Sequence, residues 1–378
     1  MNSQHLINES KRIVIKIGSA LLTNEKTGEI RQDWLQSIAD DIANLQKQSK
    51  EIVIVSSGAI ALGRKALGIE YTNTPSSISL DLKQAAAAIG QIDLVRGYDV
   101  AFHKHDIKTA LVLLSPKDTE ERQAHLNARA TLQTLLSKGH IPIINENDTV
   151  STAEIRFGDN DRLAARVAQM IGADLLIQLS TTDGLYTADP SDDENAQHIP
   201  VVESLSEDIL NMAGDAKPGL STGGMKSKLK AAQIATQAGV DMIITDGQSN
   251  NAIQALMGGA RATIFKSSDK PLSARKKWIS SHVKAMGEVI LDDGAINALK
   301  SGKSLLPSGV IKISGEYNYG DPIYVKDVEQ NILAIGLSRY NANETRHILG
   351  KKSNEISDIL GYSRGDVIIH RDDLVLQA

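Results

Sequence analysis

Short apolar runs alternate with stretches of helical periodicity over the first 267 residues. Each run is four to six residues long and consists mostly of β-branched residues or leucine, which is typical of strands buried on both faces. We predict strands at residues 13–17, 52–55, 109–114, 141–144, 175–179 and 242–245, and helices at 34–48, 161–171 and 226–238. Strands that alternate with helices predict an α/β fold with a mainly parallel sheet sandwiched by helices.

The pattern changes after residue 284, where short strand-like pieces are separated by turn signals such as Tyr319-Gly320-Asp321-Pro322. Here we predict strands at 287–291, 309–314, 322–325 and 367–370, and helices at 294–300 and near 354–360. The chain is therefore predicted to hold an α/β domain over residues 1–267, a linker over 268–284, and a small, mostly β, barrel-like domain over 285–378.

Composition narrows the class of protein. The sequence has no cysteine, which excludes disulfides, zinc–thiolate sites and cysteine nucleophiles. Residues 1–11 lack the apolar stretch of a signal peptide, and no apolar run is long enough to span a bilayer, so we expect a soluble cytoplasmic protein. The net charge is −5 and the basic excess is confined to the stretch around Arg275, so the charge pattern does not favour nucleic acid as a partner.

Candidate chemistry gathers where the predicted strands end, because ligands of open α/β sheets bind outside the carboxyl ends of the strands. Lys16 lies inside the first strand, and a lysine among apolar residues must meet an anion or reach solvent. Ser56-Ser57-Gly58-Ala59 precedes a helical stretch, where free backbone N–H groups can bind an anion. An edge-strand lysine and an ordinary serine cap would explain these two features without a ligand.

Three later segments add further candidates for ligand binding. Asn145-Glu146-Asn147-Asp148 directly follows an apolar strand, and Gly158-Asp159-Asn160-Asp161 carries more polar groups than one helix cap needs, which indicates a substrate or magnesium role. Ser221–Lys228 contains two glycines that allow close backbone approach and places Lys228 in the first turns of a helix. A cation is unfavourable there unless an anion offsets the helix dipole, so we predict a phosphate at this position.

Taken together, these segments resemble the glutamate 5-kinases, a family of the amino acid kinase superfamily. The resemblance rests on six segments: Lys16-Ile17-Gly18-Ser19, Ser56-Ser57-Gly58-Ala59-Ile60-Ala61, Ile144-Asn145-Glu146-Asn147-Asp148, Gly158-Asp159-Asn160-Asp161, Gly184-Leu185-Tyr186-Thr187-Ala188-Asp189-Pro190 and Thr222-Gly223-Gly224-Met225. In the tail, residues 315–325 and Arg339-Tyr340-Asn341 are similar to a PUA domain. The resemblance covers essentially the whole chain, and it implies the amino acid kinase fold followed by a PUA-like domain.

The resemblance also implies residue roles. Lys16 and Lys228 would contact the ATP phosphates, and Asp161 would position these lysines and the metal-bound phosphates, which makes the three residues catalytic candidates. The residues implied to bind glutamate are Ser57, Asp148 and Asn160. The residues implied to bind ATP are Lys16, Ser180, Thr181, Thr222, Gly223, Gly224, Met225, Lys226, Ser227 and Lys228. Thr181 departs from the family pattern, because many relatives carry Asp there. No side chain is assigned as a dedicated metal ligand.

The implied reaction is transfer of phosphate from ATP, with Mg²⁺, to the side-chain carboxylate of L-glutamate. The product would be L-glutamyl 5-phosphate, the first intermediate of proline biosynthesis, with L-proline as inhibitor. A carboxylate with an ordinary pKa of about 4.3 is ionised at neutral pH, so this reaction needs no general base. The labile product suggests handover to glutamyl phosphate reductase, and the family implies a homo-oligomer.

Three alternatives stay open at this point. A related kinase could act on aspartate, acetylglutamate, carbamate or UMP, because few residues around 145–160 decide the acceptor. An RNA-binding protein is possible because PUA domains elsewhere bind RNA, although the acidic, aromatic-poor tail argues against it. A protein that binds nucleotide without turnover is the third, and the pair of lysines weighs against it.

Overall fold

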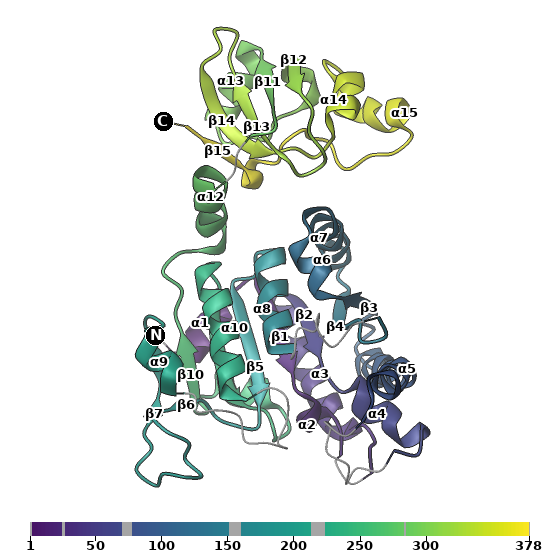
Figure 1. Cartoon of the computed structure of the whole chain (residues 1–378), viewed down its shortest axis with the longest axis vertical. Helices are drawn as coiled ribbons and strands as arrows, with labels where there is room; N and C mark the ends of the chain where they lie inside the picture. Colours follow the sequence, from purple (N-terminus) through teal and green to yellow (C-terminus); the bar gives the residue numbers. More distant parts are fainter. Residues whose placement is uncertain are drawn as a thin grey trace. The chain divides into compact units, whose positions relative to one another are not determined.

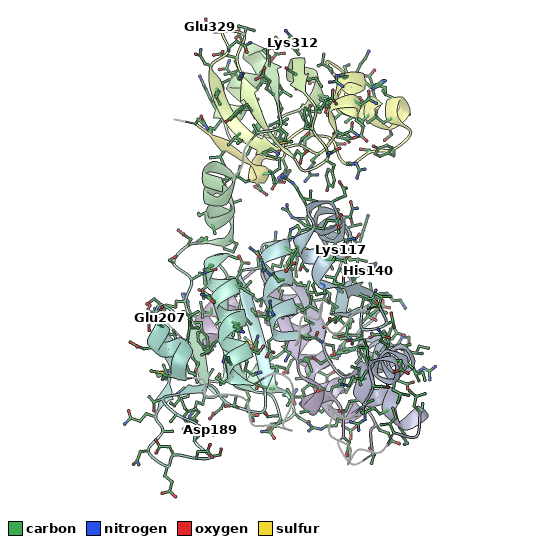
Figure 2. All side chains as sticks on the ribbon, viewed as in Figure 1. Lys117, His140, Asp189, Glu207, Lys312 and Glu329 are labelled. Carbon is green, nitrogen blue, oxygen red and sulfur yellow. The ribbon has the colours of Figure 1, made fainter. Side chains whose placement is uncertain are left out.

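The computed structural model describes residues 2–24, 27–69, 78–150, 160–212, 224–282 and 285–377 (Figure 1). The chain divides into two compact units, Met1–Pro271 and Leu272–Ala378. Figure 2 shows charged side chains at the surface of both units, for example Lys117, Asp189 and Glu207 in the first and Lys312 and Glu329 in the second. No helix in the described part of the chain is long and apolar enough to cross a membrane.

The first unit is built on an eight-stranded sheet with the order β3-β4-β2-β1-β5-β9-β10-β8. Neighbouring strands are parallel throughout, except for the antiparallel pair β9 and β10. The strands are β1 (Arg12–Ile17), β2 (Glu51–Ser56), β3 (Thr109–Leu114), β4 (Ile141–Glu146), β5 (Leu175–Ser180), β8 (Val201–Val202), β9 (Asp241–Asp246) and β10 (Ala262–Phe265); β6 (Leu185–Tyr186) and β7 (His198–Ile199) form a separate antiparallel pair.

Helices cover both faces of this sheet because every central strand is apolar on both sides. One face packs against α1 (Ser3–Glu9), α2 (Ser19–Leu22), α3 (Gln32–Lys47), α4 (Ala59–Ala66), α5 (Leu80–His103) and α11 (Ala252–Met257). The other face packs against α7 (Arg122–Ser137), α8 (Asn160–Ile171) and α10 (Met225–Gln237). The short helices α6 (Pro116–Glu120) and α9 (Glu207–Met212) complete the unit.

The predicted α/β fold with a mainly parallel sheet between helices is confirmed. All six strands and all three helices expected in this unit occur, each with ends within two residues of the prediction. Helix α5, at 24 residues, was not predicted. Its apolar residues are spread around the helix, with Leu94 and Phe102 buried but Ile92 64% exposed, so no single stripe marks it in the sequence.

The second unit is a five-stranded sheet with the order β12-β11-β13-β14-β15. Its strands are β11 (Gly287–Leu291), β12 (Val310–Gly315), β13 (Pro322–Lys326), β14 (Ile332–Leu337) and β15 (Leu374–Leu376). Its helices are α12 (Pro271–His282), α13 (Asp293–Lys300), α14 (Ala342–Ile348) and α15 (Ile356–Leu360), with 3₁₀ turns η2 (Pro307–Gly309), η3 (Ser353–Glu355) and η4 (Arg371–Asp373). The mostly β character expected of this unit is confirmed.

The strand predicted at 367–370 is wrong. Only Ile369 pairs there, in an isolated bridge with Leu305, and the strands of this region are β14 and β15 instead. The run is apolar because Ile368 and Ile369 are fully buried. Ile369 packs over Gly336 of β14, where an added Cβ would lie 2.7 Å from the Ile369 Cγ2 atom. The run is therefore apolar because its side chains fill the core of the second unit, and not because it forms a strand.

The predicted linker, residues 268–284, contains α12. Within the second unit, Ile279 of this helix is buried in an apolar cluster with Ile335 and Leu337. The exact domain boundaries stay a prediction.

Candidate active site

A buried cluster of two lysines and one aspartate lies where β1, α8 and α10 meet. Lys228 Nζ is 3.0 Å from Asp161 Oδ2, and Lys16 Nζ contacts Asp161 Oδ1. Asp161 is 0% exposed and each lysine is 7% exposed. Lys16 comes from the strand β1, whereas Asp161 and Lys228 lie in the first turns of α8 and α10. The structure thus brings together all three residues expected to be catalytic.

The electrostatics of this cluster favour an anionic ligand. Burial by itself raises the pKa of Asp161, but the charges and hydrogen bonds of Lys16 and Lys228 outweigh that effect, so its pKa lies below the ordinary value. Asp161 is therefore ionised at neutral pH. Among the residues that the structure describes, two ammonium groups then share one carboxylate, which leaves an excess positive charge in a site with little access to water. A phosphate group that reached the cluster would neutralise this charge.

Asn160, the residue before Asp161, ties the ends of two strands to α8. Its Nδ2 atom lies 2.9 Å from each of three acceptors: Ser56 O, Ser57 Oγ and Asn145 Oδ1. Ser56 and Asn145 belong to β2 and β4, and both are buried. Because Ser57 accepts from Asn160, its hydroxyl proton remains available to a ligand. Two of the three residues expected to bind glutamate, Ser57 and Asn160, are therefore in direct contact.

Helix α5 supports this network with two residues that the sequence analysis did not find. Tyr98 is fully buried and its hydroxyl donates to Ser56 Oγ at 2.8 Å; burial raises its pKa well above the ordinary value. Gln91 Oε1 accepts from Asn145 Nδ2 at 2.9 Å. Both contacts depend on α5, so they could not be inferred without that helix. The sequence gives one indication of these contacts, the polar residue Gln91 in a segment rich in Ala and Ile.

A close crossing of α4 and α5 fixes the Ser57 segment. Gly63 and Gly90 lie at the contact: an added Cβ on Gly63 would be 1.8 Å from Ala86 O, and one on Gly90 would be 1.9 Å from Ala59 O. Helix α4 begins at Ala59, two residues after Ser57, and Gly58 between them has the positive φ of 117° that favours glycine. The helix crossing therefore sets the position of the predicted acceptor loop.

The other predicted residues that the structure describes lie at or just after the ends of β4 and β5 and at the start of α10. Ser180 ends β5 and is buried, whereas Thr181 is exposed and its carbonyl accepts from Gln248 Nε2 at 3.3 Å. Gly224 precedes α10, and Met225, Lys226 and Ser227 form its first turn with Lys228. Asp148 is half-buried in the turn after β4. Thr222 and Gly223 lie outside the described residues. The roles of all these residues stay predictions.

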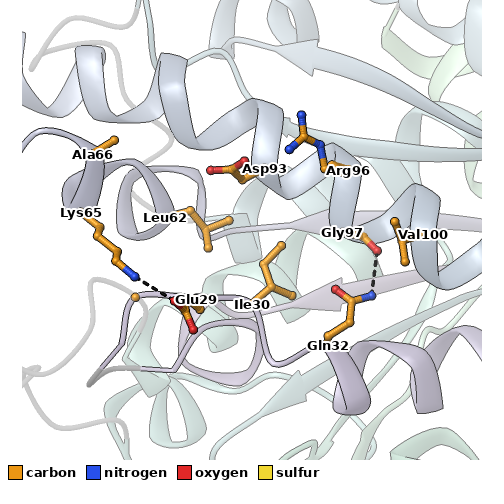
Figure 3. A pocket seen from close by; sticks show the side chains of 11 residues that line it. Glu29, Ile30, Gln32, Leu62, Lys65, Ala66, Asp93, Arg96, Gly97 and Val100 are labelled. Carbon is orange, nitrogen blue, oxygen red and sulfur yellow. Dashed lines mark hydrogen bonds and ion pairs between the residues drawn. The ribbon is translucent and has the colours of Figure 1, made fainter.

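Two further findings concern ligands. Within the described ranges, no group of three or more His, Cys, Asp or Glu side chains is placed to hold a metal ion. A cavity of about 550 Å³ lies beside α4 and α5, with Ile30, Leu62 and Val100 among its lining residues (Figure 3). Lys65 and Glu29 form an ion pair at its rim. None of the predicted site residues that the structure describes lines this cavity, so it is not the candidate active site.

Comparison with known proteins identifies the family. Residues 11–246 match the amino acid kinase family, and residues 287–360 match the PUA domain. The glutamate 5-kinase of Gluconobacter oxydans is 49% identical over 97% of this chain and 96% of its own length. That of Brucella ovis is 50% identical over 98% of this chain and 97% of its own. The chain belongs to the glutamate 5-kinase family.

A third relative is as similar to this chain as these two, and the solved structures are more distant. The glutamate 5-kinase of Bartonella henselae is 50% identical over 97% of this chain. Among solved structures, UMP kinase from Ureaplasma parvum covers 68% of this chain and 100% of its own, with 17% identity and a TM-score of 0.47. The full-length relatives confirm the resemblance to glutamate 5-kinases with a PUA domain that the sequence segments indicated.

Proposed function

We propose that this chain transfers the γ-phosphoryl group of ATP to the side-chain carboxylate of L-glutamate, forming ADP and L-glutamyl 5-phosphate. The observation that carries the proposal is the buried Lys16–Asp161–Lys228 cluster beside the Asn160 network. Relatives named glutamate 5-kinase, aligned along nearly the whole chain, support L-glutamate as the acceptor.

The chemistry needs charge neutralisation more than proton transfer. An oxygen of the glutamate side chain forms a bond to the γ-phosphorus while the bond to the β–γ bridging oxygen breaks, and that electron pair leaves with ADP. No proton moves, because the carboxylate is already ionised at neutral pH. The barrier comes from bringing two anions together, and fixed positive groups lower it by stabilising the charge on the transferred phosphoryl group. Lys16 and Lys228 supply such groups.

Asp161 and Asn160 organise the two halves of the site. Asp161 holds both ammonium groups close together when no phosphate is present, so little reorganisation is needed when one binds. Asn160 fixes Ser57 next to the cluster, and the Ser57 hydroxyl can donate to a carboxylate oxygen of the acceptor. The adjacent positions of Asn160 and Asp161 on α8 thus join the acceptor side of the site to the phosphate side.

Magnesium enters this proposal as part of the nucleotide. Mg²⁺ in proteins is usually held by one or two carboxylates together with substrate phosphates. The carboxylate nearest the predicted phosphate position, Asp161, already contacts two ammonium groups. The residues therefore fit the magnesium complex of ATP as a substrate better than a resident ion.

An assay with several phosphoryl acceptors tests the proposed reaction. ADP release is measured with Mg-ATP and each of L-glutamate, L-aspartate, N-acetyl-L-glutamate, carbamate and UMP. Turnover that depends on L-glutamate supports the proposal. Turnover with a different acceptor keeps the phosphoryl chemistry but overturns the substrate, and no turnover with any of them would favour a nucleotide-binding protein.

Asp148 provides a specific test of the acceptor side. Asp148→Ala should raise the KM for L-glutamate at least tenfold while kcat changes little, because loss of a charged hydrogen bond weakens binding by about 1.5–3 kcal/mol. Initial rates at varied L-glutamate and saturating Mg-ATP check this. Asp192→Ala, an exposed change in the segment after β6, is the control. An unchanged KM would remove Asp148 from the glutamate site.

The family relationship supports further proposals about the pathway, the regulation and the partners of this enzyme. We infer that it is the first step of proline biosynthesis in the cytoplasm, that L-proline inhibits it, and that the labile product passes to glutamyl phosphate reductase. We also infer a homo-oligomer. L-proline added to the acceptor assay tests the inhibition, product transfer with the reductase present tests the handover, and sedimentation tests the oligomer.

A further inference from the structure

Gln178, in the middle of β5, has a buried amide side chain for which the fold gives no evident reason. The residue is 0% exposed, and neither Nε2 nor Oε1 has a hydrogen-bond partner among the described residues. A buried amide without partners is costly, because water would otherwise solvate both groups. The flanking residues on β5, Ile177 and Leu179, are ordinary apolar core residues. A leucine at position 178 would fit the same strand without this cost.

The position of Gln178 relates it to the lysine cluster. In the parallel pairing of β1 and β5, Lys16 and Gln178 are direct register partners. Register partners project from the same face of a sheet, on strands that lie about 4.8 Å apart. This face is the one covered by α8 and α10, because Val14 and Leu176, each two residues earlier on its strand, belong to that core. Gln178 therefore lies beside Lys16 and in the layer that contains Asp161 and Lys228.

The hydrogen-bond acceptors available to the Lys16 ammonium group indicate a role for the Gln178 amide. An ammonium group has three protons, and in the free protein the carboxylate of Asp161 attracts both Lys16 and Lys228. A phosphoryl group in the site competes with Asp161 for Lys16. The ammonium group then needs a second acceptor within the protein to keep a defined position. Gln178 Oε1 lies on the neighbouring strand and accepts from no other donor in the part of the chain that the structure describes.

We propose that Gln178 is a positioning residue for Lys16, whose ammonium group donates to Gln178 Oε1 when a phosphoryl group occupies the site. Because Gln178 is fully buried, it acts through Lys16 and does not touch the substrate. The unpaired amide destabilises the free protein and gains its partner only in the loaded state. The inference rests on the proposed phosphoryl transfer and adds a residue to it.

The test replaces the amide with an apolar side chain of similar length, Gln178→Met. We expect the melting temperature to rise, because a buried unpaired amide is removed. We also expect kcat for glutamate-dependent ADP release to fall about tenfold or more, since a hydrogen bond to a charged group is lost, with the KM for L-glutamate within about twofold of wild type. A purely structural glutamine predicts the same rise in melting temperature with an unchanged kcat.

Two variants complete the design. Leu176→Met changes packing on the same strand and face and should leave kcat unaltered. Gln178→Glu keeps an acceptor oxygen beside Lys16, and its kcat at pH 8 should be nearer to wild type than that of Gln178→Met. If Gln178→Met does not fold, Gln178→Leu takes its place with the same expected results.

The outcomes separate this inference from the proposed function. Wild-type kcat in the apolar variant, or equal losses in Gln178→Met and Gln178→Glu, would overturn the positioning role alone. A wild-type protein that shows no turnover with any acceptor would instead overturn the proposed function on which the inference rests.

Discussion

Replacing Lys16 or Lys228 with alanine should lower kcat by roughly two to three orders of magnitude. Removal of one preorganised donor from a transition-state charge site typically costs a factor of about 10²–10³. Each lysine supplies a full charge in a cluster where all three residues are at most 7% exposed, so bulk water cannot replace it. Steady-state ADP release at saturating Mg-ATP and L-glutamate measures the effect.

The control for these variants is Lys230→Ala, which removes an exposed lysine two residues after Lys228 on α10. It should keep wild-type kcat. Each active-site variant also leaves Asp161 with one cation in place of two, and breaking a buried ion pair can cost about 3–5 kcal/mol of folding free energy. Kinetics are therefore compared below the unfolding transition of every variant. Near-normal turnover of both Lys16→Ala and Lys228→Ala would disprove the assignment of this site.

Gly63→Ala and Gly90→Ala should each destabilise the protein by about 3 kcal/mol or more, because overpacking forces backbone to move where no space exists. The added methyl group would meet the carbonyl oxygen of Ala86 or Ala59 at less than 2 Å, and neither oxygen belongs to a flexible side chain. Urea unfolding followed by circular dichroism measures the change. Any folded variant should also bind L-glutamate more weakly, because α4 begins directly after the Ser57 loop.

Gly294→Ala is a matched change for comparison. Gly294 is also helical, in α13, but an added Cβ there would meet nothing closer than the Asp292 side chain at 3.3 Å. It should be neutral or slightly stabilising, as expected of alanine in a helix. Equal stability of Gly63→Ala and Gly294→Ala would contradict the close helix contact.

The strands and the candidate site of the first unit could be predicted well because buried parallel strands have a recognisable sequence pattern. Strands buried on both faces must be apolar runs, and the polar residues after them must lie at one edge, so Lys16, Asn160 and Asp161 could be placed together before any coordinates. The relation of Asp161 to the two lysines was implied by the family resemblance and not by the strand pattern. That Asp161 contacts both lysines depends on the crossing of α8 and α10, which periodicity does not determine.

The features that escaped prediction share a physical cause: each depends on a distant neighbour. Strand β14 includes Ala334 and Gly336, which are poor strand formers. A Cβ atom at Gly336 would lie 2.7 Å from Ile369 Cγ2 and 3.0 Å from Asp373 O. The apolar run around Ile369 has strand composition but fills the core instead. In the sequence, Gln178 is only one polar residue in an apolar run. Its proposed role follows from its register with Lys16, which the sequence does not show.

The central place of β1 has a consequence for how the chain is made. This strand is synthesised well before β5, its partner on one side, and the contact beside that pairing joins Lys11 to Asp174, 163 positions later. At synthesis rates of about 5–20 residues per second, that edge stays open for roughly 8–30 s. During this interval the nascent chain exposes an apolar strand edge at the middle of its future sheet, and such an edge can pair with other chains.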